Sequence, residues 1–144
     1  MRIRISPLQE EDVSEVARIE REYYSLPWSE KAFRDALERD YYRFLKAKVD
    51  GILAGYCGYQ RSFEIADITN VTVQKEYRRQ GIARRMLTEL MAEGRAEGIE
   101  RFTLEVRSSN EAAIALYKSL GFLQEGVRKN YYESPREDAL ILWT

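Results

Sequence analysis

The residues from Val71 to Arg84 have the composition of a phosphate-binding corner. The β-branched first part predicts a strand, the last part predicts the start of a helix, and Gly81 lies between them. The free N–H groups at a helix start suit an anion such as a pyrophosphate, and three arginines nearby add positive charge. The segment lacks the Lys-Ser/Thr of a P-loop and the third glycine of a dinucleotide fingerprint. A solvated basic helix start with a packing glycine is the competing interpretation.

A carboxylate and a phenol follow at positions that suit proton transfer. Glu105 falls in the second half of a predicted strand, near the end at which α/β sheets open their ligand crevice. Tyr117 falls on the next predicted helix, so the two side chains are candidates for general base and general acid. The simpler interpretations are an exposed strand residue for Glu105 and a core aromatic for Tyr117. For Asn110, which precedes that helix, the simpler interpretation is a helix cap.

Residue types that are missing or rare exclude several kinds of site. The 144 residues include no histidine and one cysteine, Cys57, which excludes Ser-His-Asp and Cys-His catalysis, His-ligated metals and Cys-rich metal cages. A lone cysteine in an apolar strand is expected in the core of a protein from a reducing cytosol. The 23 basic and 24 acidic residues nearly cancel, and no apolar run reaches the about 20 residues of a membrane span. We therefore expect a cytoplasmic protein that uses no metal and binds neither nucleic acid nor membrane.

Periodicity predicts the elements that must position these residues. In the first half, strands are expected over 2–6, 42–49, 52–63 and 65–73. The dipeptide Asp50-Gly51 predicts a tight turn between two of them. Helical spacing from Val13 to Tyr23 predicts a helix that ends near Ser25-Leu26-Pro27, and Ser29 is a good N-cap for a second, short helix.

The second half alternates helices and strands. Helices are expected over 81–97 and from Ser109 or Asn110 to about 120, and strands over 101–106, 122–130 and 138–143. The residues 131–137 are expected to form a long loop between the last two strands. Consecutive strands mixed with strand–helix–strand units indicate an α/β domain with three layers, built on a mixed sheet and spanning residues 1–144.

Taken in order, these motifs resemble the GNAT acetyltransferase superfamily. Arg78-x-x-Gly81-x-Ala83 after a β-branched strand matches the signature Gln/Arg-x-x-Gly-x-Gly/Ala. The run Leu-Glu-Val-Arg-x-Ser-Asn-x-x-Ala-x-x-Leu-Tyr-x-x-Leu-Gly-Phe over 104–122 is similar to the second half of that fold. Pro27-Trp28-Ser29, together with Arg-Lys-Asn-Tyr-Tyr at 128–132 and Glu-Asp-Ala at 137–139, resembles the RimI-type branch, the ribosomal-protein alanine N-acetyltransferases. The resemblance implies a GNAT fold, with a mixed, mostly antiparallel central sheet that contains a bulge and a splay.

The resemblance also implies an acetyl-CoA site and a direct attack of an amine on the thioester. Glu105 would be the proton acceptor and Tyr117 the proton donor. Backbone groups of the strand before the corner would pair with the pantetheine arm, and amides of the corner would hold the pyrophosphate. The residues implied for acetyl-CoA are Val71, Thr72, Val73, Arg78, Arg79, Gln80, Gly81, Ile82, Ala83, Arg84 and Asn110.

The implied acceptor is the N-terminal amino group of a protein, with the N-terminal alanine of a small-subunit ribosomal protein as the favoured case. Tyr131 would form one wall of a peptide groove, and Leu26 with Trp28 the other. Alternatively, Trp28 is a hydrophobic staple, and one of Tyr131 and Tyr132 packs inward. The sequence leaves open two other functions on the same scaffold: acetylation of a small amine or a lysine side chain, and acyl-CoA binding without turnover.

Overall fold

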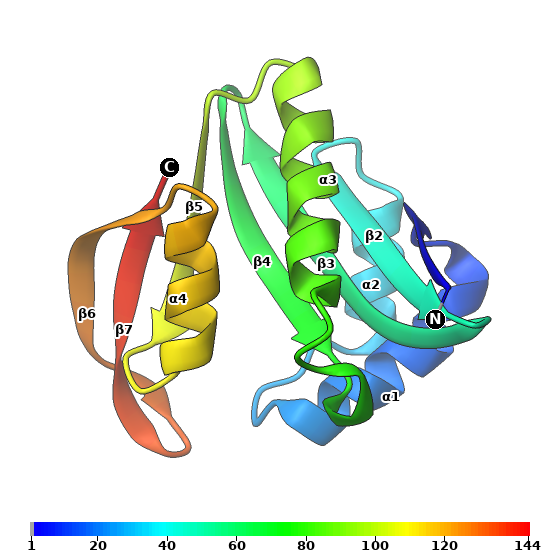
Figure 1. Ribbon diagram of the computed structural model, residues 1–144, viewed down its shortest axis with the longest axis horizontal. Helices are drawn as coiled ribbons and strands as arrows, with labels where there is room; N and C mark the ends of the chain where they lie inside the picture. The colour runs from blue at the N-terminus through cyan, green and yellow to red at the C-terminus, as the bar shows by residue number, and fades with distance from the viewer. Residues whose placement is uncertain (1) are drawn as a thin grey trace.

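A mixed β-sheet forms the centre of the computed structural model, which describes residues 2–144 (Figure 1). Its strands are β1 (Ile3–Pro7), β2 (Tyr42–Val49), β3 (Ile52–Ser62), β4 (Ile65–Val73), β5 (Arg101–Arg107), β6 (Leu123–Glu133) and β7 (Arg136–Trp143). They lie in the order β1-β2-β3-β4-β5-β7-β6. Every neighbouring pair is antiparallel except β4 and β5, which are parallel. The mixed, mostly antiparallel sheet implied by the resemblance is therefore confirmed.

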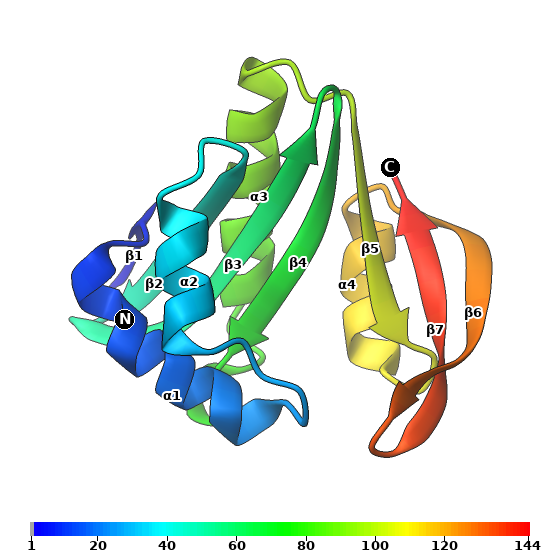
Figure 2. The same cartoon turned by 180° about the vertical axis from the view of Figure 1, so that it is seen from behind.

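Helices cover both faces of this sheet. They are α1 (Val13–Tyr23), α2 (Glu30–Leu37), α3 (Ile82–Ala96) and α4 (Glu111–Ser119), with short 3-10 turns η1 (Glu10–Asp12) and η2 (Lys75–Tyr77). Figures 1 and 2 show α3 and α4 on one face and α1 and α2 on the other, which confirms the three layers. Within residues 2–144, no helix has the length and apolar character needed to cross a membrane.

The layer of α1 and α2 is held by an aromatic cluster. Val16 and Ile19 of α1 are fully buried there with Phe33 of α2 and Tyr56 of β3. The predicted cap of α2 is present, because the Ser29 hydroxyl accepts a hydrogen bond of 3.1 Å from the Ala32 N–H. This cap fixes the end of the loop that leads from α1 into α2.

On the other face, α3 packs closely on β5. Gly94 makes this approach possible, because a Cβ at this position would lie 2.9 Å from Cζ of Phe102. Phe102 joins Leu87 and Leu90 in the second core cluster. Cys57 is fully buried in the same cluster, as expected, and burial raises the pKa of its thiol.

The sheet opens in its middle, between β4 and β5. Only three residue pairs join these strands, namely Ile65 with Arg101, Ala66 with Phe102, and Asp67 with Thr103. Beyond these pairs the two strands diverge, as both ribbon views show (Figures 1 and 2). The register of β4 against β3 also shifts near Thr69, which is a β-bulge that re-aims the strand. Both the bulge and the splay implied by the resemblance are therefore present.

One expectation about the second half is wrong. The residues 131–137 do not form a long loop, because β6 continues to Glu133 and β7 begins at Arg136. The pairing of these strands is irregular between Arg128 and Tyr132, and Asn130 has a φ of +54°. The extra residues of β6 at this irregularity interrupt the alternation of apolar and polar positions. The sequence over 131–137 therefore does not show the pattern from which a strand is predicted.

Candidate active site

The corner between η2 and α3 is open and rich in unbonded N–H groups. Gly81 has a φ of +78°, and a Cβ placed on it would meet no atom within 4 Å. Arg79 also has a positive φ, of +63°. Among the described residues, no protein oxygen accepts a hydrogen bond from the N–H groups of 79–84; the first helical bond is from Arg85 to Gly81. These features fit a diphosphate at the N-terminus of a fifteen-residue helix.

The arginines of the corner have different surroundings. The guanidinium of Arg78 turns back, since its Nε donates to the Val73 carbonyl at 2.9 Å and its Cζ lies 5.0 Å from the ring centre of Tyr23. Arg84 donates to the Ser119 hydroxyl and thereby links α3 to α4. Arg79 is exposed and makes no such bond within residues 2–144, so its side chain is the one best placed to meet a bound anion.

The edge of β4 that faces the splay is only partly occupied. The Tyr24 hydroxyl donates to the Val71 carbonyl at 2.9 Å, and Arg78 bonds the Val73 carbonyl. The N–H and C=O of one strand residue point to the same edge, so the N–H groups of Val71 and Val73 face the splay too. These N–H groups can pair with an extended ligand. The backbone groups of Thr72 point to the opposite edge of β4, toward β3. The Oγ1 atom of its side chain lies 2.8 Å from the Tyr24 hydroxyl.

A buried carboxyl group, that of Glu20, joins the loop after α1 to the neighbouring strand β3. Glu20 is only 3% exposed, and burial raises its pKa even though the Tyr56 hydroxyl and the Trp28 N–H donate to it. Tyr56 in turn is fully buried, and its pKa is raised by burial and by the nearby Glu20 carboxylate. Glu20 therefore ties the loop after α1 to β3.

Glu105 lies at the splay on the face covered by α1 and α2. Its Oε2 is 3.0 Å from Nε of Arg128, and the Arg128 guanidinium lies 5.9 Å from the ring centre of Tyr131. The negative charge of the Glu105 carboxylate is the main cause of a raised pKa of the Tyr131 hydroxyl. The structure thus brings together Glu105 and Tyr131, two of the predicted site residues, and adds Arg128.

Tyr117 approaches the splay from the opposite face. It projects from α4 into the core, is 7% exposed, and has its ring centre 5.9 Å from that of Phe122. Burial raises the pKa of its hydroxyl, with smaller contributions from Tyr24 and Tyr132 across the splay. Asn110 caps α4 by accepting from the Ala113 N–H at 3.2 Å, so the cap interpretation is confirmed and its side-chain amide N–H groups remain free for a ligand.

The two predicted walls of a peptide groove are exposed apolar side chains. Leu26 is 83% exposed on the loop after α1, and Tyr131 is 50% exposed on β6. Tyr132 is more enclosed, with the Arg107 guanidinium 4.3 Å from its ring centre. Of the two tyrosines, Tyr131 is therefore the one that is accessible.

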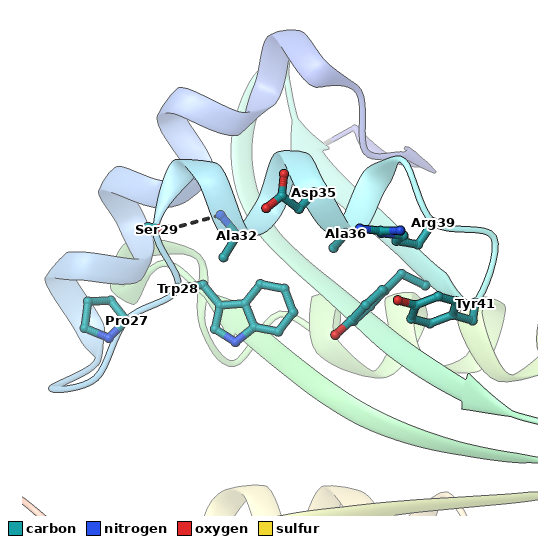
Figure 3. Close-up of a pocket in the computed structure, with 9 residues that line it drawn as sticks. Pro27, Trp28, Ser29, Ala32, Asp35, Ala36, Arg39 and Tyr41 are labelled. Atoms are coloured by element: carbon teal, nitrogen blue, oxygen red, sulfur yellow. Dashed lines mark hydrogen bonds between the residues drawn. The ribbon is translucent and has the colours of Figure 1, made fainter.

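Trp28 is mainly a packing residue. Its ring centre lies 5.2 Å from that of Phe33 and 5.8 Å from that of Phe44, within the aromatic cluster of α1 and α2. Its outer side lines a cavity of about 500 Å³ between α2 and the start of β2 (Figure 3). Tyr41 and Tyr42 line the same cavity, whereas Glu105 and Tyr117 do not.

Sequence reasoning missed several residues of this region. Tyr24 was expected only at the end of a helix, yet its hydroxyl contacts the edge of β4. Asp67 lies beside Glu105 on the diverging strands, and an acid within a β-branched strand was a signal that could have found it. No group of three or more potential metal ligands of the Cys, Asp or Glu type occurs among the described residues.

Comparisons with known proteins agree with this geometry. The model of the acetyltransferase (GNAT) family matches residues 13–122. The ribosomal protein bS18-alanine N-acetyltransferase of Escherichia coli (strain K12) is 39% identical over 140 residues, which cover 96% of this chain and 94% of that protein. The enzyme of the same name from Haemophilus ducreyi is 34% identical over 141 residues, covering 96% and 97% of the two chains. The crystal structure of the ribosomal-protein-S18-alanine N-acetyltransferase from Escherichia coli superposes with a TM-score of 0.89 at 37% identity, over 99% of this chain and 92% of that chain. By sequence and fold, this chain is an acyltransferase that belongs to the GNAT acetyltransferase family.

Proposed function

We propose that this enzyme transfers the acetyl group of acetyl-CoA to the N-terminal amino group of a protein, and that the acceptor is the N-terminal alanine of ribosomal protein bS18. Acetyltransferases of the GNAT family use acetyl-CoA, and relatives 39% and 34% identical to this chain are named for the bS18 acceptor. A ribosomal acceptor implies that the enzyme acts in the cytoplasm.

The observation that carries the proposal is the arrangement at the splay. The unpaired edge of β4 leads from the anion-binding corner at Gly81 to Glu105, and the carboxylate faces the side on which Leu26 and Tyr131 are exposed. A donor on the α3 and α4 face and an acceptor on the other face can therefore meet between the strands. This arrangement favours a polypeptide acceptor, because two apolar side chains flank the approach to Glu105.

Residues of the corner and of β4 hold the donor. Acetyl-CoA, when bound, supplies an acetyl thioester and a thiol leaving group. The N–H groups of residues 79–84, with the Arg79 side chain, bind its diphosphate. The N–H groups of Val71 and Val73 pair with its extended arm, and the Asn110 amide binds the same arm.

Glu105 and Tyr117 handle the protons on the two sides of the splay. An α-amino group has a pKa of about 7.7–8.0, so near neutral pH most acceptors arrive as ammonium ions and must lose a proton before attack. Glu105 accepts that proton and returns it to solvent. The Tyr117 hydroxyl stays protonated because burial raises its pKa, so it can donate its proton to the sulfur as the carbon–sulfur bond breaks. The second proton that the nitrogen loses as the amide forms balances the one that the thiol takes away.

A rate assay with a panel of acceptors tests the proposal. The panel contains a peptide with the N-terminal residues of bS18, the same peptide with a blocked α-amino group and an internal lysine, and free small amines. We expect CoA release with the first peptide, and a lower rate when its first residue is changed from alanine. Equal turnover of lysine or small amines contradicts the proposed acceptor, and acetyl-CoA binding without CoA release from any acceptor contradicts catalysis.

A further inference from the structure

Asp67 lies at the point where β4 and β5 part. It forms the last residue pair between these strands, opposite Thr103. Its neighbours Ala66 and Ile68 belong to the core under α3. Side chains alternate across a strand, so Asp67 faces the other side, that of the proposed acceptor.

Glu105 shares this face with Asp67. Leu104 and Val106 are buried in the core under α3, so Glu105 between them points the opposite way. Glu105 is two residues beyond Thr103, which makes it the diagonal neighbour of Asp67 across the strands. At this position the charge of Glu105 adds to the burial that raises the pKa of Asp67.

The charged and titratable groups that face Asp67 come from three further strands. They are Glu105 of β5, Arg128 and Tyr131 of β6, and Tyr42 of β2. The cation among them is Arg128, whose Nε lies 3.0 Å from Glu105 Oε2 and whose charge also lowers the pKa of Asp67. Arg128 is itself 55% exposed and rests on the Tyr131 ring, so it is free to move away from Glu105. Its position shows that Glu105, the diagonal neighbour of Asp67, binds a cation on this face.

We propose that Asp67 is a positioning residue for the acceptor: together with Glu105 it binds the acceptor's α-ammonium group, which takes the place of the Arg128 guanidinium. The inference rests on the proposed function, because it names a residue whose negative charge attracts the N-terminal ammonium group into the proposed acceptor site. The displaced guanidinium moves toward the Tyr131 ring, where a cation is favourable.

This role depends on pH in a defined direction. Asp67 is exposed at the edge of the splay, yet the surrounding strands take away part of its hydration and raise the pKa of its carboxyl to about 6, with Glu105 adding to the effect and Arg128 opposing it. Above pH 6 the two acids and Arg128 carry a net negative charge, and below it Asp67 takes up a proton and that net charge disappears. The acceptor's ammonium is therefore held more strongly above pH 6 than below it.

The variant Asp67→Asn tests the inference in the full-length enzyme saturated with acetyl-CoA. At pH 7.5 we expect KM for an N-terminal alanine peptide to rise about tenfold, as one attractive charge is lost, with kcat within about twofold. At pH 5.5 the difference in KM should shrink to less than about threefold, since the wild-type Asp67 is then largely protonated. Asp67→Glu should restore most of the affinity at pH 7.5.

Two controls separate this role from a general effect of charge or folding. Glu64→Gln removes one exposed negative charge just before β4 and should leave KM unchanged. Binding of the Nα-acetylated peptide to the CoA-bound enzyme, measured by calorimetry, should be the same in wild type and Asp67→Asn, because that peptide carries no ammonium. An unchanged KM in Asp67→Asn, or equal weakening of the acetylated peptide, overturns the inference. Failure of the wild-type enzyme to acetylate any peptide at pH 7.5 instead overturns the proposed function, so the two failures are distinct.

Discussion

At the scale of single residues, Glu105 forms an ion pair when no acceptor is bound. Its partner is the Arg128 guanidinium, which lies against the carboxylate that is proposed to take the acceptor's proton. Glu105→Gln keeps the shape of the side chain but removes its basicity, so we expect kcat to fall by about 10²- to 10⁴-fold with acetyl-CoA affinity nearly unchanged. Steady-state kinetics and acetyl-CoA titration measure the two quantities. Glu125→Gln is the matched control, since it also breaks an ion pair to an arginine, Arg101, at 2.9 Å; equal kcat in both variants rejects Glu105 as the base.

Tyr117 allows a test that separates chemistry from packing. Its hydroxyl has no hydrogen-bond partner within residues 2–144, and its ring packs on Phe122. Tyr117→Phe retains the ring, so the thermal midpoint should change little, while loss of the hydrogen bond to the departing sulfur should lower kcat by about tenfold or more. Tyr59→Phe, at another buried tyrosine of the same core, should leave both quantities unchanged. A Tyr117→Phe enzyme as fast as wild type means that Tyr117 only packs.

The sequence alone identified Glu105, Asn110 and Tyr117 as candidates, because motif order and spacing are local properties. It did not reveal the contact between Glu105 and Arg128. That contact requires β7 to lie between β5 and β6, and strand order is not encoded in any local pattern. Tyr24 was missed for the same reason, since its partner on β4 lies 47 positions away in the chain.

At the scale of elements, the loop after α1 is tied to β4 by one phenol. Tyr24 has a hydroxyl pKa raised by burial, which keeps it protonated and able to donate to the Val71 carbonyl. Tyr24→Phe should lower the free energy of unfolding by about 1 kcal/mol, the usual net value of one hydrogen bond. We also expect the freed loop to raise KM for the peptide more than KM for acetyl-CoA. Denaturant melts and initial rates measure these effects.

Tyr41→Phe is the control for the loop. Tyr41 is 40% exposed, close to the 42% of Tyr24, and its hydroxyl forms no hydrogen bond to the described residues. Stability and both KM values should therefore match the wild type. If Tyr24→Phe behaves in the same way as Tyr41→Phe, the phenol does not fix the loop.

Most elements were predictable because their signals are local. The Asp50-Gly51 turn has φ values of +51° and +85°, as a tight hairpin turn between β2 and β3 requires. Gly98 and Gly121 follow the ends of α3 and α4 with positive φ, again as expected. The end of β6 was not predictable, since the irregularity at Asn130 breaks the alternation on which strand prediction depends. The splay likewise has no sequence signal of its own, because β4 and β5 each read as ordinary strands.

At the scale of the whole molecule, the splay divides one sheet into two parts that are joined by three residue pairs between β4 and β5 and by a shared core. Beyond Asp67 and Thr103, the facing edges of β4 and β5 have no strand partner in each other, so their outward N–H groups should exchange with solvent faster than those of β3. A bound acetyl-CoA would cover the edge of β4 at Val71 and Val73, and the corner at 79–84. Hydrogen exchange in these segments should slow markedly on its addition, while β1 and β2 change little.

The same binding should stabilise the fold as a unit, because the proposed donor site takes residues from α3, α4 and β4. At a concentration one hundred times its dissociation constant, acetyl-CoA should add about 2.7 kcal/mol to the free energy of unfolding. In Gly81→Val both the protection of 79–84 and this gain should be lost, since a β-branched side chain is strained at a φ of +78° and fills the open corner. A thermal melt with and without acetyl-CoA measures the gain, and the melt without it reports any damage to the fold. Equal gains in wild type and Gly81→Val would show that the donor binds elsewhere, and the assignment of the corner would then fail.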